Sequence, residues 1–302
     1  MKLKASNEWD TLQSVVVGTA RHMGGTPLLE DAYDPKSKLH IEAGTFPMEA
    51  DCQRELDGLA SLLTDMDVKV LRPDVLPDLN QIFARDVGVV LGDRFLSTRM
   101  IEDRSAEWDG IAPLIASVSP THRLTPPKGV RLEGGDVMPM DGELWVGYSK
   151  EPDFSTFTTA RTNEAAVDWL SDQFPDWSVR GFELQKSDDD PYQNALHLDC
   201  CLSVLSGDRA ILHPTGLKQG RDVAFLQRHF QSNLLEVSAE EMFHMHCNLI
   251  SVTHRDILSC PPFERVNAQL TSWGYNVHCT PLQETAKMEG LLRCVTLPLQ
   301  RG

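Results

Sequence analysis

The sequence lacks any apolar stretch long enough to cross a membrane, since none approaches the roughly 20 residues that a transmembrane helix needs. Its opening residues, MKLKASNEWD, include two lysines but no apolar segment behind them, so we see no secretory signal. Positive charge is also scarce, because 28 lysines and arginines stand against 44 aspartates and glutamates, which gives a formal net charge of −16. Such a chain is suited to a small cationic ligand, although from charge alone the acidity could equally serve only solubility. We expect neither nucleic acid nor membrane among its partners.

Disulfide frameworks are not expected either. The seven cysteines are odd in number and scattered through a long chain. A reducing compartment is the simpler setting, and we expect the protein to be cytoplasmic. Four of the cysteines are expected to serve only packing, namely Cys200, Cys201, Cys247 and Cys279.

Common metal and nucleotide motifs are missing. Gly134-Gly135 lacks the G-x-G-x-x-G spacing and a following helix, and no G-x-S-x-G segment marks a serine nucleophile. Residues 244–247 (HMHC) hold two histidines and a cysteine, but alternation along a strand puts the cysteine on the opposite face from the histidines. No second pair of ligands accompanies them, so we expect no metal site there.

What the chain does contain is one structural unit repeated five times. A unit starts with two short apolar runs and a turn between them, which predicts a β-hairpin. Such hairpins cover residues 91–97, 140–147, 206–212 and 253–259, and residues 12–18 resemble the second half of one. Amphipathic helices are then expected over residues 51–66, 102–117, 161–174, 222–231 and 263–273. Short strands follow them, over residues 68–71, 122–124, 177–184, 233–237 and 275–279.

A further strand in each unit carries one unusual residue near its centre. These residues are Asp86, Glu133, His197, Asn248 and Cys294. They lie 47, 64, 51 and 46 residues apart, and each interval accommodates one ββαβ unit. Closing five units around an axis would bring the five residues to one site. We therefore predict an α/β fold with a single domain over residues 1–302, built as a five-bladed α/β propeller. The competing interpretation is that this order of elements recurs by chance.

The chemistry of the five residues is informative because they combine a thiol, an imidazole and carboxylates. A thiol attacks as the thiolate, which a nearby cation promotes. Histidine is the natural general acid and base near neutral pH. Carboxylates bind the parallel N–H groups of a guanidinium in bidentate fashion. The set suits a cationic amidine or guanidine as substrate, although the same residue types occur in cysteine hydrolases generally.

Each candidate also has a purely structural interpretation. Cys294 lies in an apolar strand, where a buried cysteine is usually inert. His197 could be a core histidine with satisfied hydrogen bonds. Alternation would put His197 and Asp199 on the same face of a strand, however, and two polar groups facing inward need a reason.

The acidic candidates have similar alternatives. Glu133 and Asp136 flank two glycines, so either acid could be a turn residue. Asp86 follows Arg85, as in an ordinary surface ion pair.

Several short segments, in this order, resemble the guanidino-group-modifying enzymes. This superfamily includes amidinotransferases, arginine deiminases and dimethylarginine dimethylaminohydrolases, which share the five-bladed pentein fold. Residues 6–18 (SNEWDTLQSVVVG) are similar to the opening of amidinotransferases. The other matching segments are residues 84–86 (ARD), 133–136 (EGGD), 197–199 (HLD) and 293–296 (RCVT).

The resemblance implies roles for these residues. Cys294 would attack the guanidinium carbon and form a covalent intermediate, and His197 would protonate the departing amine and then activate the second nucleophile. Glu133 and Asp86, together with Asp199, would hold the guanidinium. Further substrate contacts are expected from Asp136, Arg293 and Asn248. The resemblance implies a small cationic guanidino substrate, and neither a metal nor a cofactor. A homodimer is left open as the assembly.

Three functions remain open on the sequence. Hydrolysis is favoured over amidino transfer, because transferases usually have aspartate where this chain has Glu133 and tend to be longer. The amidinotransferase-like opening points the other way. A non-catalytic protein of the same fold is the third alternative, and it would be expected to lack the cysteine, histidine or acids that this chain has.

Overall fold

A computed structural model describes all residues from Met1 to Gly302 and contains five separate three-stranded sheets. In each sheet the middle strand pairs antiparallel with one neighbour and parallel with the other. The antiparallel neighbours, called first strands below, are β3 (Gly88–Leu91), β6 (Val137–Pro139), β9 (Leu202–Ser206), β12 (Ile250–Ser251) and β15 (Thr296–Arg301). The middle strands are β4 (Arg94–Ser97), β7 (Glu143–Tyr148), β10 (Arg209–Leu212), β13 (Asp256–Ser259) and β1 (Leu12–Val17). The third strands are β5 (Arg123–Leu124), β8 (Ser178–Glu183), β11 (Leu234–Glu236), β14 (Asn276–Cys279) and β2 (Lys69–Leu71).

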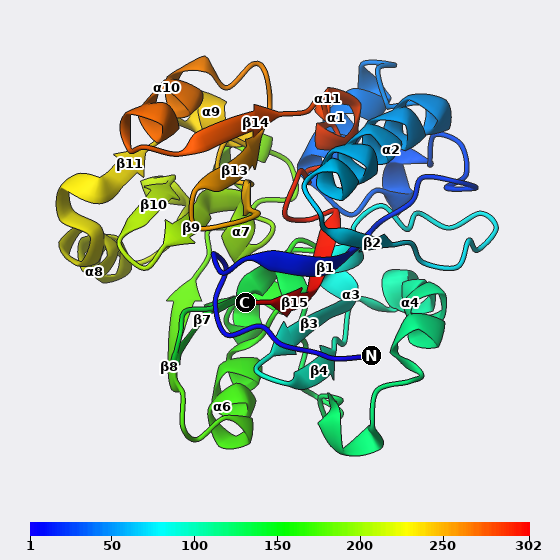
Figure 1. Cartoon of the computed structure of the whole chain (residues 1–302). Helices are drawn as coiled ribbons and strands as arrows, with labels where there is room; N and C mark the ends of the chain where they lie inside the picture. Colours follow the sequence, from blue (N-terminus) through cyan, green and yellow to red (C-terminus); the bar gives the residue numbers. More distant parts are fainter.

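At least one helix lies along the chain between the middle and third strands of every sheet, as the repeat predicts. The α-helix that precedes the third strand is α2 (Glu49–Asp65), α4 (Trp108–Ile115), α6 (Glu164–Gln173), α8 (Gly220–Phe230) or α10 (Glu264–Ser272). Figure 1 shows them distributed around the periphery of the molecule, with the strands between them. The shorter helices are α1 (Pro35–Glu42), α3 (Ala84–Val87), α5 (Glu151–Phe154), α7 (Leu198–Cys201), α9 (Ala239–Phe243) and α11 (Gln283–Ala286). The five-repeat arrangement is therefore present throughout the chain.

The first sheet joins segments from opposite ends of the chain. Strand β15 pairs antiparallel with β1, so the strand that follows Cys294 completes the sheet begun near the N-terminus. Figure 1 shows the dark blue β1 and the red β15 side by side. The half-unit predicted at residues 12–18 is therefore completed by β15, which lies about 280 residues later in the chain.

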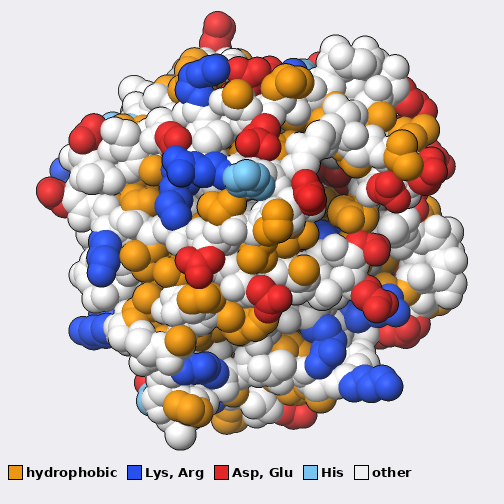
Figure 2. Space-filling view, turned by 90° about the vertical axis from the view of Figure 1, so that its right-hand side faces the viewer, with side chains coloured by type: hydrophobic (Ala, Val, Ile, Leu, Met, Phe, Trp, Pro, Cys, Tyr) orange, Lys and Arg blue, Asp and Glu red, His pale blue; other side chains and the backbone are white.

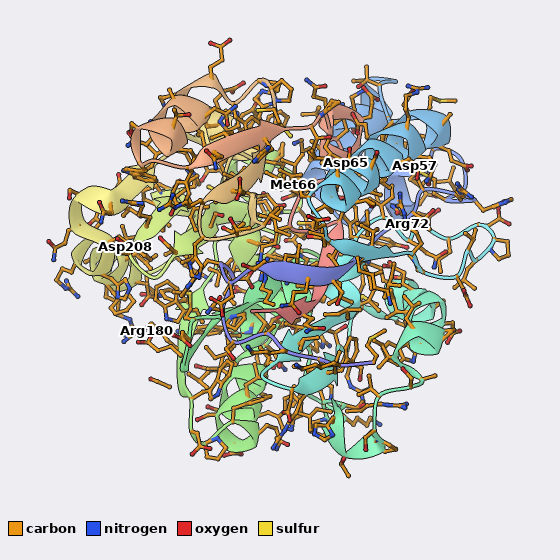
Figure 3. The ribbon with its side chains drawn as sticks, viewed as in Figure 1. Asp57, Asp65, Met66, Arg72, Arg180 and Asp208 are labelled. Carbon is orange, nitrogen blue, oxygen red and sulfur yellow. The ribbon has the colours of Figure 1, made fainter.

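Helix α2 illustrates how the sequence determines one of these elements. Its buried residues Cys52, Leu56, Leu59 and Leu63 are spaced by three or four positions and form one apolar face against the core. On its exposed side, Asp57 pairs with the guanidinium of Arg72, which follows β2, at 2.6 Å (Figure 3). None of the helices combines the length with the apolar character that crossing a bilayer requires.

The five polar residues are not at the centres of strands, and this prediction was wrong. Each lies in the non-strand segment that leads into a first strand: Asp86 in α3, His197 at the N-cap of α7, and Cys294 in the turn before β15. Glu133 precedes the 3-10 helix Gly134–Asp136, and Asn248 lies two residues before β12. A turn leaves backbone N–H groups free for polar side chains, whereas the strand ladder consumes them.

Two glycines provide a matched test of this architecture. A Cβ at Gly18, where β1 ends, would lie 1.9 Å from the carbonyl oxygen of Ile82, which is backbone and cannot rotate away. Gly58 is exposed in α2, and a Cβ there meets no atom within 4 Å. We expect Gly18→Ala to destabilise the protein by about 1–3 kcal/mol, as overpacking does. Gly58→Ala should stabilise it by about 1 kcal/mol through helix propensity. Denaturant unfolding of both variants measures this, and equal effects would contradict the close packing at Gly18.

Candidate active site

One cavity, of about 300 Å³, collects several of the reactive side chains that the repeat predicts. Cys294, His197 and Asp86 all line it. Each precedes the first strand of a different sheet, namely β15, β9 and β3. Three separate units therefore contribute one functional group each to a common space.

The Cys294 thiol is held by an amide. Its Sγ lies 3.1 Å from the Nδ2 of Asn248 and 3.7 Å from both carboxylate oxygens of Asp199. The Oδ1 of Asn248 accepts hydrogen bonds from the backbone N–H groups of Arg293 and Cys294, at 2.9 and 3.2 Å. Asn248 thus positions both the thiol and the turn that carries it, which explains why a neutral amide lies at this point of the repeat.

Burial and nearby carboxylates favour the protonated thiol of Cys294 in the free protein. Burial raises the pKa of the Cys294 thiol; contact with the Cys200 thiol opposes this rise, and Asp199 and Asp86 add to it. A cation placed beside the sulfur would reverse this balance, because an opposite charge favours the thiolate. The site is consequently suited to a thiol that ionises when a cationic ligand arrives.

His197 lies between two carboxylates. Its Nε2 is 2.8 Å from a carboxylate oxygen of Glu133, and its Nδ1 is 3.6 Å from the Oδ1 of Asp86. Burial opposes the charged ring, but Asp86, Asp136 and Glu133 outweigh burial and raise the pKa of His197 to about 9. The ring packs against the backbone of Gly135, where a Cβ would lie 2.8 Å from it. His197 is therefore an imidazolium at neutral pH.

Glu133 lies behind His197 and does not line the cavity. Arg161 and Arg104 approach it with N–O distances of 3.2 and 3.4 Å. Burial favours its neutral form, but Arg161, His197 and Arg104 outweigh burial and hold the pKa of Glu133 well below its usual range. We expected Glu133 to bind the substrate directly, but a fully buried carboxylate with these partners does not reach the cavity. Its contact with His197 instead suits a role in positioning the imidazole ring.

Arg293 is also engaged entirely by the protein. It donates to the carboxylate of Glu8 through Nε and Nη2, to Asp199 through Nη1 at 2.7 Å, and to the carbonyl oxygens of Gly135 and Val137. All five of its N–H groups have partners, so none is left for a substrate. The predicted substrate contact is replaced by a structural one next to the nucleophile.

Asp199 and His197 have different partners but lie close together. Asp199 contacts Arg293 and Cys294, whereas His197 contacts Asp86 and Glu133. Ligand atoms of His197, Asp199 and Cys200 lie within 4.8 Å of one another, so His197 and Asp199 are neighbours. They are brought together at the start of the helical turn α7, and not by the alternation along a strand that the sequence predicted.

Asp136 is buried too, and its role differs from the predicted substrate contact. Its Oδ1 accepts the backbone N–H of Leu198 at 2.9 Å, which anchors the first turn of α7. Burial raises the pKa of Asp136, although His197 and Lys186 act the other way. Like Asp199, Asn248 and Arg293, it does not line the cavity.

Sequence patterns did not identify several of the cavity residues. Those with ionisable side chains are Asp31, Tyr33, Asp34, Asp78, Asp103, Arg104, Glu107, Arg161 and Glu289. Asp34 caps α1, which is not one of the strands and helices that define the repeat, so the repeat could not find it. Glu289 lies five residues before Cys294 in the sequence, and this proximity was the one available signal.

Carboxylates and His197 approach one another closely enough to raise the question of a metal. Ligand atoms of Asp86, Glu133 and His197 lie within 4.8 Å of one another. Both carboxylates, however, already bind Arg104, whose charge opposes a metal cation at the same place. Asp86, Glu133 and His197 therefore do not fit a metal centre.

The histidines of residues 244–247 lie elsewhere and separately. His244 pairs with Glu240 at 3.1 Å on α9, and His246 stacks on Phe263 with ring centroids 3.8 Å apart. Neither belongs to a group of potential metal ligands.

Comparison with known proteins gives consistent results. The uncharacterised protein YkgA of Bacillus subtilis is 28% identical over 306 aligned residues, covering 100% of this chain and 96% of that protein. Among solved structures, the N-terminal domain of ArgZ, an arginine dihydrolase from cyanobacteria, matches with a TM-score of 0.78 and 17% identity, over 97% of this chain and 98% of that one. SxtG, an amidinotransferase from Microseira wollei, matches with a TM-score of 0.76 and 17% identity, over 99% and 97%. These two likenesses establish the fold.

A family model adds the remaining step. The model described as "N,N dimethylarginine dimethylhydrolase, eukaryotic" matches residues 38–301, which include every residue of the cavity discussed above except Asp31, Tyr33 and Asp34. The fold and the family model agree with the motifs of the repeat, and the chain belongs to the N,N dimethylarginine dimethylhydrolase family of the guanidino-modifying pentein superfamily.

Proposed function

We propose that the protein hydrolyses a C–N bond of a guanidino compound through a covalent intermediate on Cys294. The observation that carries the proposal is that Cys294, His197 and Asp86 line one cavity. The five sheets would act as blades of a propeller that encloses this cavity. The cytoplasm is the proposed setting, which agrees with seven free cysteines.

The first half of the reaction follows from the charges. A guanidinium is planar and positive, and the Oδ1 of Asp86 is buried without a hydrogen-bond partner, so it is available to accept an N–H of the substrate. The bound cation lowers the pKa of the Cys294 thiol, and the resulting thiolate attacks the guanidinium carbon. The tetrahedral intermediate then expels an amine, and His197 gives it the proton that the departing nitrogen needs.

In the second half of the reaction the same histidine acts as a base. Having lost its proton, His197 can accept one from a water molecule that attacks the carbon bound to Cys294. Glu133 keeps the ring in place, because its carboxylate lies 2.8 Å from Nε2. The products are an amine and a urea-type compound, and the thiol is regenerated.

Amidino transfer is the alternative, in which an acceptor amine replaces the water. It shares every residue of the first half. The resemblance of residues 6–18 to amidinotransferases and the structural likeness to SxtG favour it. Glu133 and the family match favour hydrolysis.

Cys294 can be tested by selective labelling. We expect the cationic reagent 2-chloroacetamidine to alkylate Cys294 first, because the carboxylates of the cavity attract it. Its neutral counterpart 2-chloroacetamide should instead label Cys279 first, since this is the one exposed cysteine. Peptide mass spectrometry distinguishes the two sites. Cys294→Ser should abolish turnover while leaving the fold intact, and a folded, active serine variant would refute the assignment.

The pair His197 and Glu133 can be tested through pH dependence. We expect His197→Ala to lower kcat by roughly 10²–10⁴-fold, as loss of a general acid–base group does. In the wild type, the alkaline limb of the kcat/KM profile should fall near pH 9, where His197 loses its proton. Glu133→Gln removes one of the charges that raise this pKa, so the limb should move to lower pH. The exposed Glu164→Gln is the matched control and should leave the profile unchanged. An unmoved limb in Glu133→Gln would assign Glu133 another role.

Isotope labelling distinguishes hydrolysis from transfer. In ¹⁸O-labelled water we expect one labelled oxygen in the urea-type product without any added amine. A transferase must exclude water from the intermediate and would require an acceptor. Turnover that depends on an added amine and incorporates no label would establish transfer in place of hydrolysis.

A further inference from the structure

The first arginine of the cavity is already bound to a carboxylate of the protein. Arg104 donates through Nε and Nη2 to the two oxygens of Glu107, at 2.7 and 3.0 Å, which is a bidentate pair. Its Nη1 lies 2.9 Å from Asp86 and 3.4 Å from Glu133. Glu107 thus occupies the guanidinium fork that a carboxylate of a ligand would otherwise use.

Each nitrogen of the second arginine likewise has a partner within the protein. Arg161 donates through Nη1 to Glu133 at 3.2 Å, through Nη2 to the carbonyl oxygen of Tyr33 at 3.0 Å, and through Nε to that of Thr158 at 3.1 Å. Lys36 lies nearby, but it lines a neighbouring cavity and donates to the carbonyl oxygen of Phe243. A carboxylate entering the cavity would meet no unpaired cation other than the imidazolium of His197, which two protein carboxylates already flank.

Acidic groups, in contrast, are abundant and partly unpaired. The carboxylates that line the cavity are Asp31, Asp34, Asp78, Asp86, Asp103, Glu107 and Glu289. The Oε2 of Glu289 and the Oδ1 of Asp86 are buried without any hydrogen-bond partner. Burial and the neighbouring Asp34 raise the pKa of Glu289 well above its usual value, although Asn194 and Lys36 act the other way. Each of these two carboxylates therefore has one oxygen that can accept a hydrogen bond from an N–H group of a ligand.

We infer that the substrate is a guanidinoalkylamine, with a guanidinium at one end, an amine at the other and no carboxylate. The guanidinium would meet Asp86 beside Cys294, and the ammonium would meet the acidic part of the cavity that includes Glu289. This inference rests on the proposed function, since it names the substrate class of the same site. Burying a carboxylate without a partner cation is strongly unfavourable, so the cavity selects against it.

Three compounds of nearly equal length test the inference. They are agmatine (4-guanidinobutylamine), arginine, which adds a carboxylate to it, and 4-guanidinobutanoate, which has a carboxylate in place of the terminal aminomethyl group. We expect kcat/KM for agmatine to exceed that for arginine by at least about tenfold, equivalent to about 1.4 kcal/mol, with guanidinobutanoate the poorest. A higher kcat/KM for arginine or guanidinobutanoate would overturn the inference and leave the proposed function intact.

A variant tests the mechanism of this selection. Glu107→Gln keeps the shape of the side chain but removes its charge, which frees the Arg104 fork. We expect the agmatine-to-arginine ratio of kcat/KM to fall at least about fivefold. Glu102→Gln lies in the same 3-10 helix, is exposed and does not line the cavity, so it should leave the ratio unchanged. An unchanged ratio in Glu107→Gln would also count against the inference.

Binding measurements keep the two proposals distinguishable. Calorimetry on the inactive Cys294→Ser protein should give a Kd for agmatine at least about tenfold lower than for arginine, with or without turnover in the wild type. Equal or reversed affinities would overturn the substrate class. If agmatine binds as expected but no guanidino compound is converted and 2-chloroacetamidine does not label Cys294, the proposed reaction fails while the recognition stands.

Discussion

Arg293 is the interaction on which the rest of the site depends. Its guanidinium joins Glu8 from the segment before β1, the backbone around β6, and Asp199 from α7. It is also the residue next to Cys294 in the sequence. Burial opposes its charge, but Glu8 and Asp199 outweigh burial and raise its pKa further above the usual value, so the ion remains paired at all relevant pH. Removing one member of such a buried network is costly because the others are left charged and unpaired.

The charges around the cavity explain why a thiol with a raised pKa is compatible with catalysis. Asp86 and Asp199 favour the neutral thiol in the free protein. The same carboxylates attract the cation whose arrival makes the thiolate favourable. In the proposed reaction, activation and recognition would therefore be one event, and the thiol would stay unreactive until a cationic ligand is bound. His197 would provide the complementary behaviour, because Asp86, Asp136 and Glu133 raise its pKa against the effect of burial and would keep it protonated until the leaving amine takes its proton.

The sequence was sufficient to predict the repeat, but it was not sufficient to predict the positions of side chains within the repeat. Hairpin turns such as Asp141-Gly142, where both φ angles are positive, and the apolar spacing of α2 are local signals, so these elements were predicted close to their observed bounds. Whether His197 lies in a strand or caps a helical turn depends on which N–H groups surround it, and these are determined by the tertiary structure. The same holds for Arg293, whose five hydrogen bonds reach distant segments, and for Asp34, which lies outside the elements that define the repeat.

The placement of each reactive group on a different sheet has a mechanical consequence. The relative positions of Cys294, His197 and Asp86 are fixed by how β15, β9 and β3 pack beside one another, and not by the geometry within any one sheet. A small rigid-body shift between sheets changes these positions while leaving every strand intact. Effective catalysis tolerates misplacements of only about an ångström before losing roughly 10²-fold in rate. On heating, the protein should therefore lose the arrangement of these three groups through small shifts between intact sheets before its strands unfold.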